Sequence, residues 1–82
     1  MKQVKYTVMY NDEHDRICCQ DFNATEERKI IPLARTIVNE ARLQFKRAHP
    51  SVTVRKSWYN LLVVQEYGTG KIIYPEKQLT NG

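Results

Sequence analysis

The sequence contains few of the residues that cross-link small proteins. Its 82 residues include only two cysteines, Cys18 and Cys19, which are adjacent. Neighbouring cysteines rarely bridge each other, because on a strand their side chains point to opposite faces. A disulfide scaffold is therefore excluded, and we expect free thiols in a reducing compartment. So short a chain buries only a small core, and it would gain stability from a partner or from a second copy in a homodimer.

Long apolar runs are also missing. The longest, Leu61 to Val64, is far shorter than the ~20 residues that cross a membrane. The first ten residues alternate between polar and apolar types and lack the apolar core of a secretory signal. We therefore expect a cytoplasmic protein with no membrane partner. The absence of linkers and repeats predicts a single domain over residues 1–82.

Side chains that carry catalysis or hold metals are scarce. His14 lies in an acidic turn, His49 lies at a predicted helix end, and no serine has the context of an activated nucleophile. Together with Cys18 and Cys19, the histidines are zinc-ligand types, but adjacent cysteines do not form the spaced pair typical of structural zinc sites. We expect a protein that is not an enzyme and that has no metal or cofactor.

A phosphate-binding loop is suggested only superficially by the segment GTGK at 68–71. A Walker loop requires a longer glycine-rich segment between a strand and a helix. Here the two glycines separate two strand-like segments, which is typical of a hairpin turn.

The N-terminal part of the chain has the pattern of a β-hairpin. Residues 3–10 alternate, with Val4, Tyr6, Val8 and Tyr10 on one face and Lys5, Thr7 and Met9 on the other. Residues 16–22 form a second strand-like segment. Between them, residues 11–15 (NDEHD) have turn composition.

A single long helix is predicted next. Asn23 and Glu26 have the spacing of a capping box, and apolar residues recur with a helical period as far as Ala48, before His49-Pro50 ends the helix. Pro32 conflicts with a helix that starts at residue 24. Either the helix is kinked there, or a short turn at 24–30 precedes a helix that begins near residue 32.

Three further strands are predicted at 51–59, 61–67 and 71–75, followed by a frayed tail at 76–82. The order ββαβββ predicts an α+β domain, in which one main helix packs on one face of an antiparallel sheet. We expect the core to contain the following residues: Val8, Leu33, Ile37, Ala41, Phe45, Val54 and Val63.

One face of the predicted helix is unusually basic. The chain has a net charge of +4, and residues 24–50 hold six of its Lys and Arg residues against three Asp and Glu. Arg35 and Arg42 have no acidic residue three or four positions away, and Arg42 and Lys46 repel each other at i,i+4. We therefore predict a partner-binding surface that consists of Arg28, Arg35, Asn39, Arg42, Leu43, Lys46 and Arg47.

Three interpretations of these basic residues remain open. They form a solvated face, they pair with the protein's own acidic residues at 12–15, or they contact an acidic partner. A second candidate surface consists of Arg55, Lys56, Trp58 and Tyr59, because a sheet with one helix leaves its other face open and adjacent aromatic residues on a strand face opposite ways.

These features favour a non-catalytic protein-binding module. Such a module occupies a surface of a larger protein or nucleoprotein complex that carries an acidic patch. The small size is typical of accessory or inhibitor proteins of phages and mobile elements. The alternative is a nucleic-acid-binding domain that uses the same basic helix face.

Overall fold

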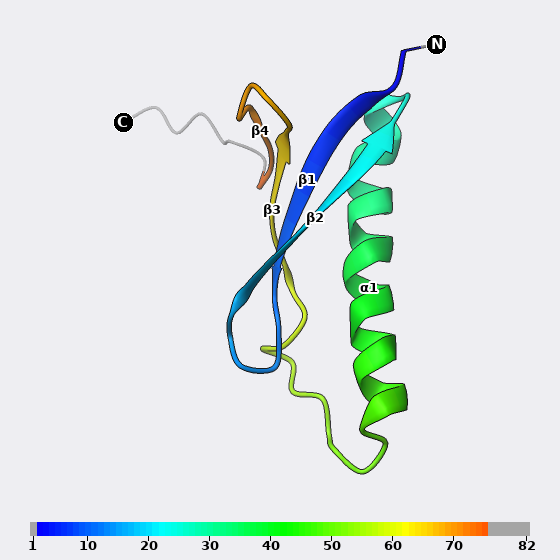
Figure 1. Ribbon diagram of the computed structural model, residues 1–82, viewed down its shortest axis with the longest axis vertical. Coiled ribbons are helices and arrows are strands. Elements are labelled where there is room, and N and C mark those ends of the chain that lie inside the picture. The colour runs from blue at the N-terminus through cyan, green and yellow to red at the C-terminus, as the bar shows by residue number, and fades with distance from the viewer. Residues whose placement is uncertain (1, 76–82) are drawn as a thin grey trace.

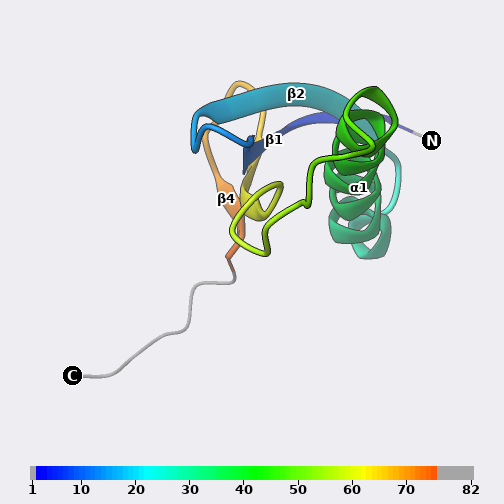
Figure 2. The same ribbon diagram turned by 90° about the horizontal axis from the view of Figure 1, so that it is seen from below.

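The computed structural model describes residues 2–75, and the predicted tail at 76–82 lies outside these residues. Four strands form one antiparallel sheet in the order β2-β1-β3-β4, and one helix packs on one face of it (Figures 1 and 2). The elements are β1 (Val4–Asn11), β2 (Ile17–Ala24), the short 3₁₀ helix η1 (Glu27–Lys29), α1 (Ile30–Ala48), β3 (Leu61–Glu66) and β4 (Ile72–Tyr74). The predicted α+β class is confirmed.

The predicted hairpin is confirmed as β1 and β2, which pair along their whole length from Val4 opposite Ala24 to Asn11 opposite Ile17. The turn is organised by Asp12. Its backbone N–H donates to the carbonyl of Arg16 at 3.0 Å, and its carboxylate accepts hydrogen bonds from the N–H groups of His14 and Arg16, each at 2.8 Å. The turn composition of this segment therefore has a direct structural role.

The start of the helix differs from the predicted capping box. Asn23 belongs to β2, where it lies opposite Lys5. The single turn η1 precedes α1, as one of the two interpretations of Pro32 required. Pro32 is the third residue of α1, where a backbone N–H has no partner within the helix, so proline costs no hydrogen bond there. The helix ends as predicted, with the N–H of His49 bonded to the carbonyl of Phe45 at 2.9 Å.

The strand predicted at 51–59 is wrong. Residues 49–60 form a loop that returns the chain from the end of α1 to the start of β3. The end of α1 and the β1–β2 turn lie at the same end of the molecule, where this loop leads the chain back toward β3 (Figure 1). Val52 and Val54 alternate as in a strand, but Val54 packs partly against the core and Val52 is exposed. The alternation of apolar residues here therefore arises because one side of the loop packs against the core, and it does not indicate a strand.

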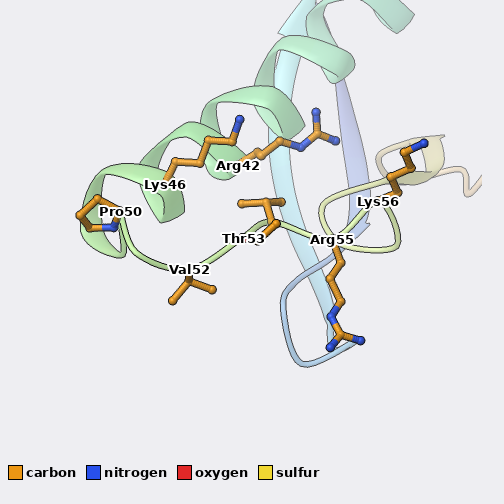
Figure 3. Close-up of a pocket in the computed structure, with 8 residues that line it drawn as sticks. Arg42, Lys46, Pro50, Val52, Thr53, Arg55 and Lys56 are labelled. Carbon is orange, nitrogen blue, oxygen red and sulfur yellow. The ribbon is translucent and has the colours of Figure 1, made fainter.

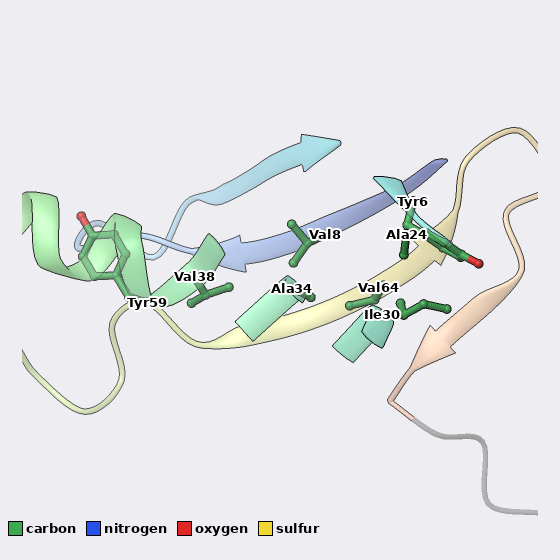
Figure 4. Packing of buried hydrophobic residues seen from close by; sticks show 8 residues of the cluster. All are labelled: Tyr6, Val8, Ala24, Ile30, Ala34, Val38, Tyr59 and Val64. Atoms are coloured by element: carbon green, nitrogen blue, oxygen red, sulfur yellow. The ribbon is translucent and has the colours of Figure 1, made fainter. Parts of the chain in front are cut away.

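The core lies between α1 and the facing side of the sheet (Figure 4). It consists of Tyr6, Val8, Ala24, Ile30, Ala34, Val38, Tyr59 and Val64. Of the predicted core residues, Val8 is fully buried, and four others pack partly buried against the cluster: Ile37, Ala41, Phe45 and Val54.

Two core predictions are wrong by one position. Leu33 is 39% exposed, whereas its neighbour Ala34 is fully buried. Val64 is fully buried opposite Val8, whereas Val63 lies opposite Met9 on the other face of the sheet. One position rotates a residue by a quarter turn or more on a helix and moves it to the opposite face on a strand. The sequence pattern therefore located the elements, while the register decided which neighbour is buried.

In residues 2–75, no helix is both long enough and apolar enough to cross a membrane.

Candidate binding groove

A groove runs along the side of α1 that faces the 49–60 loop (Figure 3). Its larger part, about 670 Å³, is lined by Arg42, Lys46, Pro50, Val52, Thr53, Val54, Arg55 and Lys56. A second hollow of about 400 Å³ continues along the helix and is lined by Arg35, Thr36, Val38, Asn39, Arg42, Tyr59, Asn60 and Leu61. Arg42 lines both hollows. We call the two together the basic groove.

The basic groove brings together residues from both surfaces predicted from the sequence. Helical spacing places Arg35, Asn39, Arg42 and Lys46 in one row along α1. The loop supplies Arg55 and Lys56 on the opposite wall. The lining residues thus include five cationic side chains, and no Asp or Glu occurs among them. Because the residues that line the two hollows carry positive charge and include no carboxylate, this groove favours an acidic ligand.

Arg42 is held in place by the protein itself. Its Nη2 donates a hydrogen bond to the backbone carbonyl of Tyr59 at 2.7 Å, and its side chain is half-buried. Arg42 has no acidic partner within the helix, as its sequence position predicts, but its guanidinium is bonded to the loop backbone and is not freely solvated. A guanidinium has five N–H donors, so one bond to the loop leaves others available to a ligand. This bond fixes the position of the charge before any ligand arrives.

Tyr59 connects the groove to the core. It is only 7% exposed, and its backbone adopts a φ of +55°, a conformation that is costly for an aromatic residue. This conformation accompanies the bond from its carbonyl to Arg42, while its ring packs 5.8 Å from the ring of Phe45. Tyr59 is therefore mainly a structural residue of the groove wall, and little of its side chain is exposed for the contact predicted from the sequence.

The hydroxyl of Tyr59 donates a hydrogen bond to a carboxylate oxygen of Glu13 in the β1–β2 turn. This bond lowers the pKa of Glu13. Burial, followed by the same hydrogen bond, raises the pKa of Tyr59 well above its ordinary range. The turn and the loop are thus joined by a charge-assisted hydrogen bond.

Asn11 fixes the other side of the loop. It is only 5% exposed, its Nδ2 donates to the carbonyl of Ser57, and its Oδ1 accepts from the N–H of Asn60 at 2.7 Å. Neither this role nor that of Glu13 follows from the sequence. Both residues lie in or beside a segment of ordinary turn composition, and no local pattern indicates that they contact a loop more than 40 residues away.

The remaining predicted contact residues lie outside the basic groove. Arg28 belongs to η1 and lies 3.5 Å from the carboxylate of Glu26. Leu43 and Arg47 line neither hollow. Trp58 is half-buried and packs edge-on against Phe45, with ring centres 5.7 Å apart. Arg35, by contrast, lines the second hollow of the groove; it is exposed and lies 5.7 Å from the ring centre of Tyr74.

The acidic residues at 12–15 do not neutralise the helix. Asp12 and Glu13 are occupied by the turn and by Tyr59, and Asp15 accepts a bond from Asn11 at 3.4 Å. Across residues 2–75, no ion pair joins these acidic residues to Arg35 or Arg42. The interpretation of the basic residues as partners of this turn is therefore wrong.

The four candidate zinc ligands are not gathered into a site. His49 packs against Phe45, with ring centres 4.8 Å apart, and Cys18 lies 4.0 Å from a carboxylate oxygen of Asp12. Burial and the nearby Asp12 raise the pKa of Cys18. In the described part of the chain, no group of three or more His, Cys, Asp or Glu residues is arranged to hold a metal ion.

Comparison with known proteins identifies no relative, since no family model, curated protein or solved structure matches this chain.

Proposed function

We propose that this protein is a non-catalytic binding module that docks on an acidic patch of a larger protein or nucleoprotein complex through the basic groove. The observation that carries the proposal is the set of five cations around the groove, with no carboxylate among the lining residues. The protein would act by occupying a surface, as small accessory or inhibitor proteins of phages and mobile elements do. The two free cysteines are consistent with a reducing cytoplasm.

The composition of the groove favours a protein ligand over nucleic acid. Its larger hollow combines cations with the apolar side chains of Pro50, Val52 and Val54. Protein interfaces combine apolar contacts with arginine in this way. The two aromatic residues of the 49–60 loop are not free to stack with single-stranded nucleic acid in the groove, because Tyr59 is buried and Trp58 packs on Phe45.

Nucleic-acid binding is the second candidate. The row of cations along α1 favours it, since phosphate contacts require positive charge and little else. Binding to phosphates weakens steeply as salt concentration rises, whereas an interface with an apolar component weakens much less.

The experiment compares two adjacent charge reversals. Lys46→Glu changes a groove residue, and Arg47→Glu makes the same change of charge at the next position, outside the groove. Both side chains are exposed at the end of α1, so both variants should keep the parent stability within about 0.5 kcal/mol. Each protein is immobilised and exposed to extract of the native host after nuclease treatment, and captured proteins are identified by mass spectrometry.

We expect the parent and Arg47→Glu to capture the same acidic protein and Lys46→Glu to lose it. Equal capture by all three proteins contradicts the groove as the docking site. A parallel titration with a labelled DNA duplex tests the second candidate. Tight duplex binding that is lost in Lys46→Glu and falls steeply with salt would replace the first proposal by the second.

A further inference from the structure

The two edges of the sheet differ in how well they are protected against pairing with another strand. At one edge, β4 has only three residues and is followed by Pro75, which has no N–H to offer. At the other edge, β2 has eight residues and contains no lysine, arginine or proline. Proteins usually blunt long edges with such residues, because exposed N–H and C=O groups attract another strand. The one charged side chain of β2, Asp21, accepts a hydrogen bond from the hydroxyl of Thr7 in β1 at 2.8 Å, so it is held by the neighbouring strand. The β2 edge is therefore open to pairing.

The register of the sheet identifies the β2 residues whose backbone N–H and C=O groups point away from β1. In an antiparallel ladder, bonds to one neighbour come from alternate residues. Asp12 bonds to Arg16 at the hairpin end, which assigns the even-numbered residues of the hairpin to the β1–β2 ladder. The odd-numbered residues of β1 bond toward β3, as the bonds between Asn11 and Asn60 and between Tyr67 and Lys5 show. The outward residues of β2 are Ile17, Cys19, Asp21 and Asn23, and all four are exposed.

We propose that β2 pairs antiparallel with β2 of a second copy of this chain, about a two-fold axis at Gln20. In this register Cys19 lies opposite Asp21 of the other copy, and Ile17 lies opposite Asn23. All four outward residues of each strand are then paired, which allows up to eight hydrogen bonds, from four N–H donors on each of two strands. The two sheets join into one continuous sheet.

This register pairs the two strands more favourably than the registers with the two-fold axis at Asp21 or at Cys19. Moving the axis to Asp21 places two carboxylates directly opposite each other, which destabilises a pair of strands. Moving it to Cys19 leaves the backbone groups of Asn23 beyond the end of the partner strand. At Gln20, the axis brings together two amide side chains, each of which both donates and accepts hydrogen bonds. The β2 strand is therefore complementary to the β2 strand of a second copy.

The proposed dimer leaves the basic groove free. The groove lies along α1, the 49–60 loop and the start of β3, whereas β2 is the far edge of the sheet. Because even-numbered residues face even-numbered residues across the axis, both helices lie on the same face of the joined sheet. If the proposed function holds, the dimer presents two grooves to one side and gains avidity for a partner with two acidic patches. Dimerisation itself does not depend on that function.

The test measures self-association by sedimentation equilibrium over protein concentrations up to about 1 mM, because pairing along one short strand is weaker than a full-sized interface. Gln20→Lys places two like charges at the axis and should weaken dimerisation about fivefold. Gln20→Glu should weaken it similarly, and an equimolar mixture of the two variants should restore it as a heterodimer. Gln20 is exposed, so neither change should disturb the fold.

A second pair of variants tests the backbone contacts. Cys19→Pro removes an outward N–H and should abolish dimerisation, while Cys19→Val keeps that N–H and should retain it. Circular dichroism and melting temperature verify that both variants remain folded. A parent protein that is monomeric up to about 1 mM overturns the proposal. A dimer that is unaffected by Gln20→Lys or by a folded Cys19→Pro overturns it too, since that dimer uses another surface.

Discussion

Arg42 of α1 donates a hydrogen bond of 2.7 Å to the backbone carbonyl of Tyr59, a residue whose φ is +55°. This contact ties the helix to the loop that forms the opposite wall of the basic groove. It also means that the most central cation of the groove has a structural role as well as an electrostatic one. A substitution of Arg42 should therefore affect both stability and the charge of the groove, whereas a substitution of Lys46 should affect the charge alone.

Arg42→Ala should lower the free energy of unfolding by about 1–2 kcal/mol, because the partly buried carbonyl of Tyr59 loses its donor. Arg35→Ala removes the same charge from an exposed position and should change stability by less than about 0.5 kcal/mol. Urea denaturation of the two variants measures the difference. Equal stabilities would show that the bond to Tyr59 contributes nothing in solution.

Tyr59→Phe should destabilise the protein by about 1 kcal/mol at pH 7, since the hydroxyl is lost from Glu13. The matched control is Tyr67→Phe, which removes a hydroxyl from a ring that is 57% exposed. The control should have no measurable effect. A loss in both variants would assign the effect to something other than the bond to Glu13.

The same bond predicts a pH dependence. Because it lowers the pKa of Glu13 in the folded protein, its contribution is fully present above the ordinary glutamate pKa of about 4.3 and disappears as pH falls through the lower folded value. The stability difference between the parent and Tyr59→Phe should therefore shrink on acidification below about pH 4. Denaturation curves at several pH values test this, and a difference that grows in acid contradicts it.

Asn11→Ala should release the 49–60 loop, because the carbonyl of Ser57 and the N–H of Asn60 both lose their partner. We expect a loss of about 2 kcal/mol, since more than one buried hydrogen bond is broken. Hydrogen exchange at the amide of Asn60 should accelerate more than exchange at the amides of the hairpin. Uniform acceleration would instead indicate global destabilisation without a local effect on the loop.

Ile30→Ala should cost about 2–5 kcal/mol, because Ile30 is only 1% exposed in the core. Leu33→Ala removes a side chain that is 39% exposed and should cost well under half as much. Thermal melting of the two variants tests the helix face directly. A larger loss in Leu33→Ala would mean that α1 is rotated relative to the sheet.

The elements that depend on local preferences were predictable from the amino-acid pattern alone. Alternation in β1, the turn composition around Asp12 and the helical period up to His49 were enough to place the hairpin and α1. The strands at Leu61–Glu66 and Ile72–Tyr74 also followed from short apolar runs around a glycine turn. These features arise within a few residues, so neighbouring side chains reveal them. The row of cations on α1 was predictable for the same reason.

What those elements pack against was set by the tertiary structure. It replaced the strand at 51–59 with a loop, because Asn11, Glu13 and Arg42 supply from a distance the hydrogen bonds that a sheet ladder would have provided. It buried Tyr59 and brought Arg55 and Lys56 across from the helix, so that two separate predicted surfaces became one groove. Such contacts join residues far apart in the chain, and hydrogen bonding between distant groups leaves no periodic pattern in the sequence.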